Sequence, residues 1–335
     1  MNKLWFPIIF VWFGSNCYAE NLREVVISSP GPGSLTYLPV DLIPFIHADA
    51  EEGLQLRIIH TASGVIALRN MLTYNSDFAV AGVPAAMSQQ ANGGDVVVIA
   101  AVSGAPLFVL MVRAELQSQV QQIGDLTGKI IGVNTSTSSS KTSSEQILEL
   151  LLKSNKVSLD SVRIVPAGQD WMSQSALIML DKVDAIMGDE PFASRLLAQR
   201  QVFFLANLGQ PATVSKVPGM NFLHAALETR SDVITNEPHM VKKVVRMIQR
   251  SLAWIANHSP QQLVDVFAIK HEEERAALLH VLQTYPNVFS RDGKFIPAQL
   301  HETEVLFQSS NANQVYNDKL KVTQMLDTRW LDDMQ

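Results

Sequence analysis

The chain has 335 residues, of which 47% are hydrophobic and 17% are charged. Such a composition supports a sizeable core and more than one compact unit, and it excludes an intrinsically disordered chain. The formal net charge is −6 and no cluster of Lys or Arg occurs, which excludes the basic surface that a nucleic-acid-binding protein needs.

Residues 1–19 have the pattern of a secretory signal peptide. Lys3 provides a positive start, residues 4–13 are almost entirely apolar, and small side chains precede a cleavage site predicted after Ala19. The apolar run is about half of the roughly 20 residues that a membrane-spanning helix needs. Cys17 lacks the sequence context of a lipoprotein signal, and cleavage would remove this single cysteine. We therefore expect a soluble periplasmic protein without disulfides.

Two series of strands alternating with helices follow. In the first series, strands are expected at 25–27, 56–59, 78–81, 96–102 and 107–112, with helices at 38–46, 65–72 and 84–90. In the second series, strands are expected at 129–133, 162–165, 185–187 and 202–206, with helices at 143–152, 172–180 and 191–201. This alternation predicts βαβ units and mainly parallel sheets.

The pattern becomes helical after residue 237. Helices are expected at 241–257, 260–267, 272–285 and 297–308, each introduced by a proline or by acidic residues. The sequence therefore predicts an α/β protein with a helical C-terminal region.

An internal similarity links the two series. Residues 77–84 and 184–191 both run from an aspartate, through a short apolar strand and a glycine turn, to a proline seven residues later. Any βα unit can share this pattern, so coincidence remains an alternative. Together with the two series of elements, the similarity favours two related lobes.

Several chemical motifs are absent or incomplete. The glycines at Gly31 and Gly33 lack the third glycine and the distal acid of a dinucleotide-binding loop. The eight histidines do not occur at metal-ligand spacing. We expect no catalytic residue, no metal and no cofactor.

Loops at which a strand feeds a helix are the better candidates for a site. In open α/β sheets ligands collect at the carboxyl ends of strands, where helix N-termini present free N–H groups. The candidate ligand-binding residues in these loops are Ser34, Leu35, Thr36 and Tyr37, Ser63 and Gly64, Gly82 and Val83, Ser136, Thr137, Ser138 and Ser139, Trp171, and Asp189 and Glu190.

Each loop also has an interpretation without a ligand. Ser34 could cap a helix while Tyr37 fills the core, residues 136–139 could form a flexible linker, and Trp171 could be a core residue. We favour ligand contact for these first two loops because each lies directly between a strand and a helix. For Asp189 and Glu190, contact with ligand N–H groups and capping of the next helix stay equally open.

Segments of the chain resemble a known family. Residues 125–133 (Asp-Leu-Thr-Gly-Lys-Ile-Ile-Gly-Val) are similar to the start of the second lobe in periplasmic binding proteins of the nitrate/sulfonate/taurine and thiamine-precursor group (SsuA/THI5-like, NMT1-like). Residues 182–185 with 190–193 resemble a later strand-to-helix segment, and 71–78 its first-lobe counterpart. The resemblance covers about residues 24–290.

This resemblance implies a two-lobe, type II periplasmic-binding-protein fold. Lobe 1 would contain residues 20–111 and 222–335 with the C-terminal helices, and lobe 2 residues 112–221, with crossings near Met111 and Phe222. It also assigns ligand contacts to the loops named above and implies an ABC permease as partner. We expect a monomer that binds a small molecule and no nucleic acid.

The implied function is that of an exported substrate-binding component of an ABC importer. A periplasmic sensor that signals to a receptor is an alternative, and an enzyme of the thiamine-pyrimidine type is disfavoured because such relatives are expected to need clustered cysteines. The ligand could be sulfonate-, nitrate- or pyrimidine-like. The loops contain no Arg or Lys, with Lys141 the nearest, so a neutral or N–H-rich ring is favoured over a bare anion.

Overall fold

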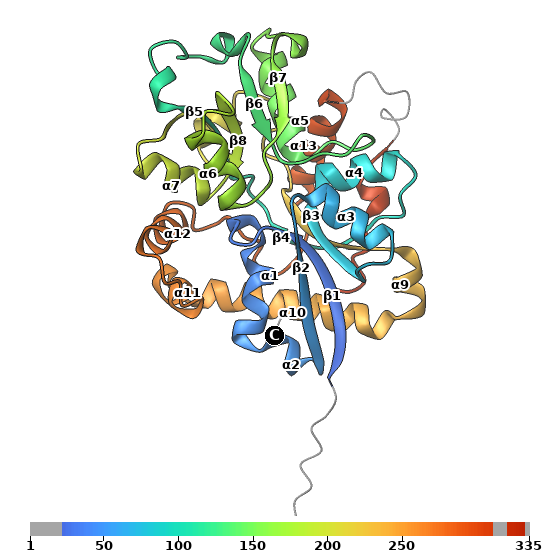
Figure 1. Ribbon diagram of the computed structural model, residues 1–335. Helices are drawn as coiled ribbons and strands as arrows, with labels where there is room; N and C mark the ends of the chain where they lie inside the picture. Colours follow the sequence, from blue (N-terminus) through green and yellow to red (C-terminus); the bar gives the residue numbers. More distant parts are fainter. Residues whose placement is uncertain (1–21, 311–319, 332–335) are drawn as a thin grey trace, which may run out of the picture.

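The structure is a computed structural model that describes residues 22–310 and 320–331. The predicted signal peptide, its cleavage site and Cys17 lie outside these residues. The chain folds into two α/β lobes, each built on a five-stranded sheet that helices flank (Figure 1). The predicted two-lobed α/β fold is confirmed.

The first sheet has the strand order β2-β1-β3-β10-β4. Its strands are β1 (Arg23–Pro30), β2 (Leu54–Thr61), β3 (Phe78–Gly82), β4 (Val97–Ser103) and β10 (Ala225–Thr229). Strand β1 pairs parallel with β2 and β3, whereas β10 pairs antiparallel with both β3 and β4. The sheet is therefore mainly parallel, with one reversed strand.

The second sheet has the strand order β7-β6-β8-β5-β9. Its strands are β5 (Phe108–Arg113), β6 (Ile130–Val133), β7 (Arg163–Pro166), β8 (Ala185–Asp189) and β9 (Val202–Asn207). Here β5 is the reversed strand, antiparallel to β8 and β9. Strands β3 and β8 thus occupy equivalent positions beside a reversed strand, which accounts for the similarity between residues 77–84 and 184–191.

Each reversed strand is the first strand that the chain forms after it has passed from the other sheet. Strand β5 opens the second series, and β10 returns to the first sheet after β9, so the chain passes between the sheets at 104–107 and 208–224. Met111 pairs with Ile186 and Phe204 inside the second sheet. The lobe boundaries predicted above remain a proposal, and the pairing favours a first crossing before β5.

Strand β10 escapes prediction from the sequence. Its residues, Ala-Ala-Leu-Glu-Thr, include several that favour a helix. All five are buried between β3 and β4, so tertiary packing overrides the local preference. Glu228 Oε2 accepts the Ala81 N–H at 3.0 Å, and burial raises the pKa of the Glu228 carboxyl well above its usual range.

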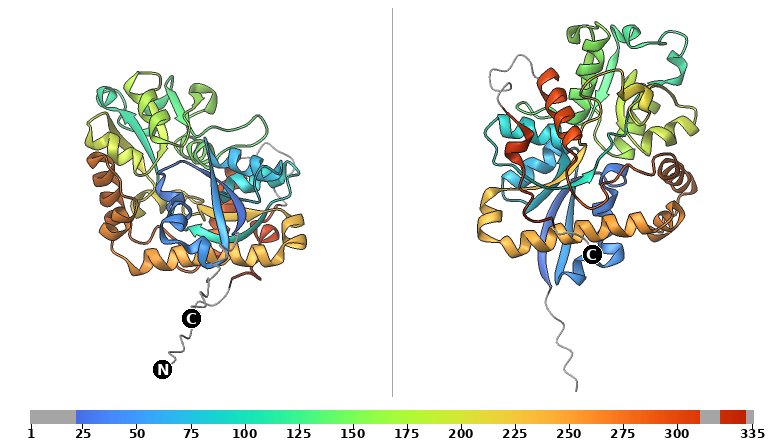
Figure 2. Two further views of the ribbon diagram at one scale, coloured as in Figure 1. Left: turned by 60° about the horizontal axis from the view of Figure 1, so that its bottom comes forward. Right: turned by 180° about the vertical axis from the view of Figure 1, so that it is seen from behind.

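The helices lie on the faces of the sheets and along the base of the first lobe (Figures 1 and 2). They are α1 (Leu38–Leu42), α2 (Ala48–Glu51), α3 (Gly64–Leu72), α4 (Val83–Ala91), α5 (Ser143–Ser154), α6 (Trp171–Met179), α7 (Phe192–Ala198), α8 (Pro211–Val214), α9 (Ser231–Asn236), α10 (Pro238–Asn257), α11 (Pro260–Val266), α12 (Glu272–Thr284) and α13 (Pro297–Ser310). Short 3-10 turns occur at Leu35–Tyr37, Ile43–Ile46, Ala114–Leu116, Ile123–Leu126, Leu159–Ser161 and Val322–Met325.

One predicted helix is divided. The expected helix over 38–46 consists of α1 and the 3-10 turn Ile43–Ile46, with Pro44 near the start of that turn. Proline has no N–H to continue the helical bonding. Phe45, which lies in this turn, is 51% exposed, and its ring contacts the ring of Phe267.

Helix α10 supports the first sheet. Its apolar face carries Val241, Val244, Val245, Ile248 and Leu252, all buried in one core with strand residues of the first sheet. The amphipathic helix predicted over 241–257 therefore packs its apolar face against the first sheet, as expected.

The C-terminal helices connect the lobes. Helix α12 packs against α7 of the second lobe, and α13 packs on both α4 and α5. Leu306 of α13 belongs to the core of the second lobe, whereas Phe307 belongs to a core of the first. Within residues 22–310 and 320–331, no helix combines the length and apolar character that crossing a bilayer requires.

Glu52 provides a test of how α10 is held. Its side chain is 4% exposed, and its carboxylate accepts hydrogen bonds from Arg246 Nη2 at 2.6 Å and from Arg250 Nε at 2.8 Å. We expect Glu52→Ala to lower the free energy of unfolding in urea by about 1–3 kcal/mol, because charge-assisted bonds are lost from a buried position. Glu24→Ala removes a pair with Arg57 in which both side chains are half exposed, and should cost at most about 1 kcal/mol. Equal losses in both variants would contradict this assignment.

Candidate ligand-binding site

The loops at the ends of the strands meet across a junction between the two lobes. The Leu35 N–H donates to the Glu190 carbonyl at 2.9 Å, Ser63 Oγ donates to the Thr135 carbonyl at 2.5 Å, and Asn92 Nδ2 donates to the Ser139 carbonyl at 2.7 Å. Ser63 also caps α3, because its Oγ accepts the Ile66 N–H. The predicted loops therefore contact one another directly.

A small cavity lies at the centre of this junction, and we call it the central cavity. Its volume is about 10 Å³, close to the space that one water molecule needs. Its wall comes from the first lobe, the second lobe and the crossing segments, and consists of Tyr37, Gly64, Val65, Gly82, Ala85, Phe108, Asn134, Thr142, Ser143, Gln169 and His224.

Gly82 and Ser143 lie close together across the junction. Gly82 has ordinary extended dihedral angles, with φ −69° and ψ 127°, so its backbone does not require glycine. A Cβ at this position would overlap Ser143 Oγ. The absence of a side chain at Gly82 is therefore what lets α5 approach β3.

His224 is buried beside the central cavity. Burial lowers the pKa of its imidazole to about 3, so the ring is neutral at physiological pH. The ring packs 4.7 Å from the Phe108 ring, and Thr36 Oγ1 lies 3.4 Å from its Nδ1. Its Nε2 is buried without a partner among the described residues. Sequence reasoning missed His224, because no motif surrounds it.

Asp189 and Glu190 are buried without a cationic partner in the described structure. Asp189 accepts hydrogen bonds from Gln169 at 2.8 Å and Gln174 at 3.2 Å, and Glu190 accepts from the Ser194 N–H at 3.0 Å and Oγ at 2.9 Å. Burial raises the pKa of Asp189 to about 6 and that of Glu190 to about 7. Glu190 thus binds to the first turn of α7, as the helix-capping interpretation predicted.

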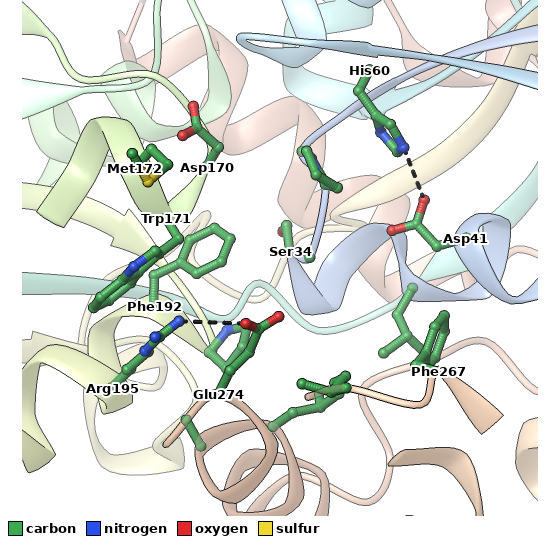
Figure 3. Close-up of a pocket in the computed structure, with 18 of the residues that line it drawn as sticks. Ser34, Asp41, His60, Asp170, Trp171, Met172, Phe192, Arg195, Phe267 and Glu274 are labelled. Carbon is green, nitrogen blue, oxygen red and sulfur yellow. Dashed lines mark ion pairs between the residues drawn. The ribbon is translucent and has the colours of Figure 1, made fainter. Parts of the chain in front are cut away.

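A much larger cavity opens beside the junction, and we call it the lateral cavity (Figure 3). Its volume is about 560 Å³, and both lobes line it. The first lobe contributes Ser34 and Phe45, and the second contributes Trp171 and Phe192. Residues of α12 and of the segment before it, including Phe267 and Leu278, complete the wall. Its volume lies within the range of about 300–1,000 Å³ that is typical of small-molecule sites.

Arg195 lies in this wall and was missed by sequence reasoning. Its guanidinium stacks 3.9 Å over the Trp171 ring, and its Nη1 is 3.6 Å from Glu274 Oε2 (Figure 3). The hypothesis that the site lacks a cation considered only the loops, and Arg195 lies in α7, one turn beyond Pro191. The expectation of a site without Arg or Lys therefore does not describe the lateral cavity.

Asp41 and His60 face each other on the opposite side of the lateral cavity (Figure 3). His60 Nε2 is 3.9 Å from Asp41 Oδ1, which is too long for a hydrogen bond. Burial raises the pKa of Asp41 to about 7 and lowers the pKa of His60. Because both shifts favour the neutral forms, this contact is weak as an ion pair near neutral pH.

The structure distributes the predicted residues over three environments. Ser34 and Trp171 line the lateral cavity, and Tyr37, Gly64 and Gly82 line the central cavity. Six further residues are buried around the junction without lining either of these cavities, namely Leu35, Thr36, Ser63, Val83, Asp189 and Glu190.

The loop over 136–139 behaves differently. Ser138 and Ser139 are exposed, Ser136 and Thr137 are partly exposed, and none of the four lines either cavity. Thr137 Oγ1 accepts the Ser140 N–H at 3.1 Å, so the loop turns back on itself. Thr142 and Ser143, just beyond this hydroxyl-rich tract, reach the central cavity instead.

The described residues contain no group of three or more His, Cys, Asp or Glu side chains that could hold a metal ion.

Comparison with known proteins identifies similar sequences and folds. The NMT1/THI5-like family model matches residues 50–262. A structure from Bordetella bronchiseptica superposes with a TM-score of 0.83 at 17% identity, covering 93% of this chain and 96% of that chain. The periplasmic aliphatic sulphonate binding protein SsuA from Escherichia coli has a TM-score of 0.67 at 14% identity, covering 93% and 95%.

The same fold also occurs in an enzyme. The desulfurization enzyme DSZB superposes with a TM-score of 0.57 at 14% identity, covering 92% of this chain and 97% of that chain. No curated protein sequence matches the chain. At these identities the structural similarities establish a shared fold.

The close approach at Gly82 can be tested directly. We expect Gly82→Ala to destabilise the closed junction by about 1–3 kcal/mol through steric overlap with Ser143. Small-angle X-ray scattering should then give a larger radius of gyration. Adding Ser143→Ala should restore most of the compact form, because it removes the overlapping hydroxyl. Gly124→Ala, where the nearest atom is 4.0 Å away, should change nothing, and failure of the rescue would contradict the steric explanation.

The raised pKa of Glu190 predicts a pH dependence of stability. Because its folded pKa of about 7 exceeds the ordinary 4.5, its contribution is complete at low pH and is lost as the pH rises towards 7. The difference in unfolding free energy between pH 5.5 and pH 8 should therefore shrink by about 1–2 kcal/mol in Glu190→Gln. Urea unfolding at both pH values measures this difference.

Glu237→Gln is the matched control for this experiment. Hydrogen bonding to Arg23 lowers the pKa of Glu237, so its titration lies below the measured window. An unchanged pH dependence in Glu190→Gln would show that this carboxylate is ionised in the folded protein throughout.

Proposed function

The chain belongs to the NMT1/THI5-like family, and we propose that it is the substrate-binding component of an importer, which encloses a small molecule between its lobes and delivers it to a membrane permease. The family assignment agrees with the resemblance found in the sequence. The periplasmic location of the sulphonate-binding relative and the predicted signal peptide both support export.

The observation that carries this proposal is the lateral cavity. It is bounded by helices and loops of both lobes, so a molecule inside it would contact both at once. A ligand that binds both lobes stabilises their closed arrangement by the difference in its affinity for the closed and open forms. Closure of this kind gives a permease a surface that reports whether ligand is bound.

Opening of the two lobes would break the contacts at the junction. The Leu35–Glu190 and Ser63–Thr135 hydrogen bonds and the Arg195–Glu274 ion pair all join one lobe to the other. The two crossings, α13 and the packing of α12 on α7 and of α4 on α5 also join the lobes. Hinge motion about the crossings at 104–107 and 208–224 would therefore separate the loops without unfolding either sheet.

Catalysis is the competing class of function, because the fold is shared with an enzyme. A binding protein must release its ligand unchanged, whereas an enzyme must convert it. The buried carboxyls at the junction accept hydrogen bonds from Gln and Ser side chains of the same lobe, which satisfies them within the fold. This arrangement supports binding, and turnover measurements provide the direct comparison.

A ligand screen tests the proposed function. A chain that begins after Ala19 would be unfolded thermally in the presence of alkanesulfonates, nitrate, pyrimidines, amino acids and uncharged aromatic compounds. A true ligand at about 100 times its Kd should stabilise the fold by about 2.7 kcal/mol. It should also be recovered chemically unchanged. Stabilisation by no compound, together with conversion of any one of them, would overturn the proposal in favour of an enzyme.

A further inference from the structure

The volume of the lateral cavity restricts the size of its ligand. At about 560 Å³, the cavity falls within the range of sites that enclose drug-sized molecules. A nitrate ion or a short-chain sulfonate would fill only a small part of it. An unfilled cavity forgoes the dispersion contacts that give a small molecule its affinity. The volume therefore favours a larger ligand than these anions.

The wall of the cavity is rich in aromatic side chains. Phe45 and Phe267 lie with their ring centres 5.0 Å apart in an edge-to-face arrangement. Trp171 and Phe192 of the second lobe lie across the cavity from Phe267 (Figure 3). Aromatic walls on both sides favour a ligand that has flat rings of its own, since offset and edge-to-face ring contacts add to the burial of apolar surface.

The charges in the wall disfavour an anion. The guanidinium in this wall belongs to Arg195, and it already contacts Glu274 and the Trp171 ring. Three acidic side chains, Asp41, Asp170 and Glu274, also line the cavity. An anionic group would have to compete with Glu274 for Arg195, and it would be repelled by the carboxylate of Asp170. Asp41 adds less repulsion, because burial raises its pKa and favours its neutral form.

We propose that the lateral cavity binds an uncharged, mainly apolar molecule with linked or fused aromatic rings, and that Glu274 excludes anions by engaging Arg195. This inference rests on the proposed function, because it names the class of ligand that the binding protein would enclose. Part of the specificity then comes from repulsion, because the Glu274 carboxylate that pairs with Arg195 also repels anionic ligands.

Two fluorescent probes that share one ring system test the proposal. N-phenyl-1-naphthylamine is uncharged, and 8-anilinonaphthalene-1-sulfonate differs from it by a single sulfonate group. Both increase their emission in an apolar site, so each can be titrated into the folded chain that begins after Ala19. We expect the uncharged probe to saturate at one molecule per chain and to bind about tenfold more tightly than the sulfonate, or more.

A pair of variants on α12 locates the bound probe. Ala277 is 8% exposed and lines the lateral cavity, whereas its neighbour Ala276 is exposed and does not. Ala277→Trp should fill the cavity and abolish binding of the uncharged probe, and Ala276→Trp should leave its Kd unchanged. Circular dichroism must show that both variants are folded.

A second pair tests the role of charge without filling the cavity. Glu274→Gln releases Arg195 and should reduce the preference for the uncharged probe by about fivefold, the range expected for one partly exposed charge pair. Glu273 lies next to it on α12 but bonds Gln199 at 2.7 Å, outside the lateral cavity. Glu273→Gln should therefore leave the preference as it is.

The outcomes separate this proposal from the function on which it rests. Equal or tighter binding of the sulfonate probe would overturn the ligand class, as would binding that survives Ala277→Trp in a folded protein. If a small anion stabilises the chain thermally while the uncharged probe fails to bind, the binding function stands and this inference fails. If neither the probe nor any compound of the thermal screen binds, this inference is wrong, and conversion of any of those compounds would overturn the proposed function as well.

Discussion

The arrangement of the whole molecule depends on two strands that run against their sheets. In each lobe the reversed strand, β10 or β5, pairs on both sides with strands of opposite direction. Each of them enters its sheet directly after the chain has crossed from the other lobe, β5 after residues 104–107 and β10 after residues 208–224. The carboxyl ends of the remaining strands then face each other across the crossings. That constraint brings Gly82 to Ser143, and it places Phe108 and His224, which flank the crossings, in the wall of the central cavity.

Where the strand ends meet, their polar groups are shielded from water and need hydrogen-bond partners within the protein. A buried charge that lacks an opposite charge is costly, so carboxyls and imidazoles in such a place shift towards their neutral forms. Asp189, Glu190 and His224 all shift in that direction, and burial is the largest cause in each case. Amide and hydroxyl donors from Gln169, Gln174 and Ser194 hold the two carboxyls. The acids therefore have a structural role that a sequence suggests only as one of two alternatives.

The sequence predicts the elements whose local pattern and tertiary role agree. The apolar runs of β4 and β5 and the amphipathic face of α10 occur where they are expected. Prediction fails where packing overrides local preference, as in β10, or where a residue reaches the site from a helix rather than a loop, as Arg195 does. The hydroxyl-rich loop over 136–139 is the converse case, since its chemistry fits a site but its position at the edge of the junction does not. Only contacts between segments distant in sequence determine these outcomes.

In the proposed function, the two cavities have different roles. The central cavity has room for about one water molecule, so its polar wall serves chiefly to fit the lobes together. The lateral cavity keeps its volume while the same lobes are in contact. A rigid ring system held between Phe45 of one lobe and Trp171 of the other would couple the lobes through dispersion contacts, which are weak singly but numerous. Closure would then depend on the shape of the ligand more than on its charge, because the one guanidinium in the wall is already engaged by Glu274.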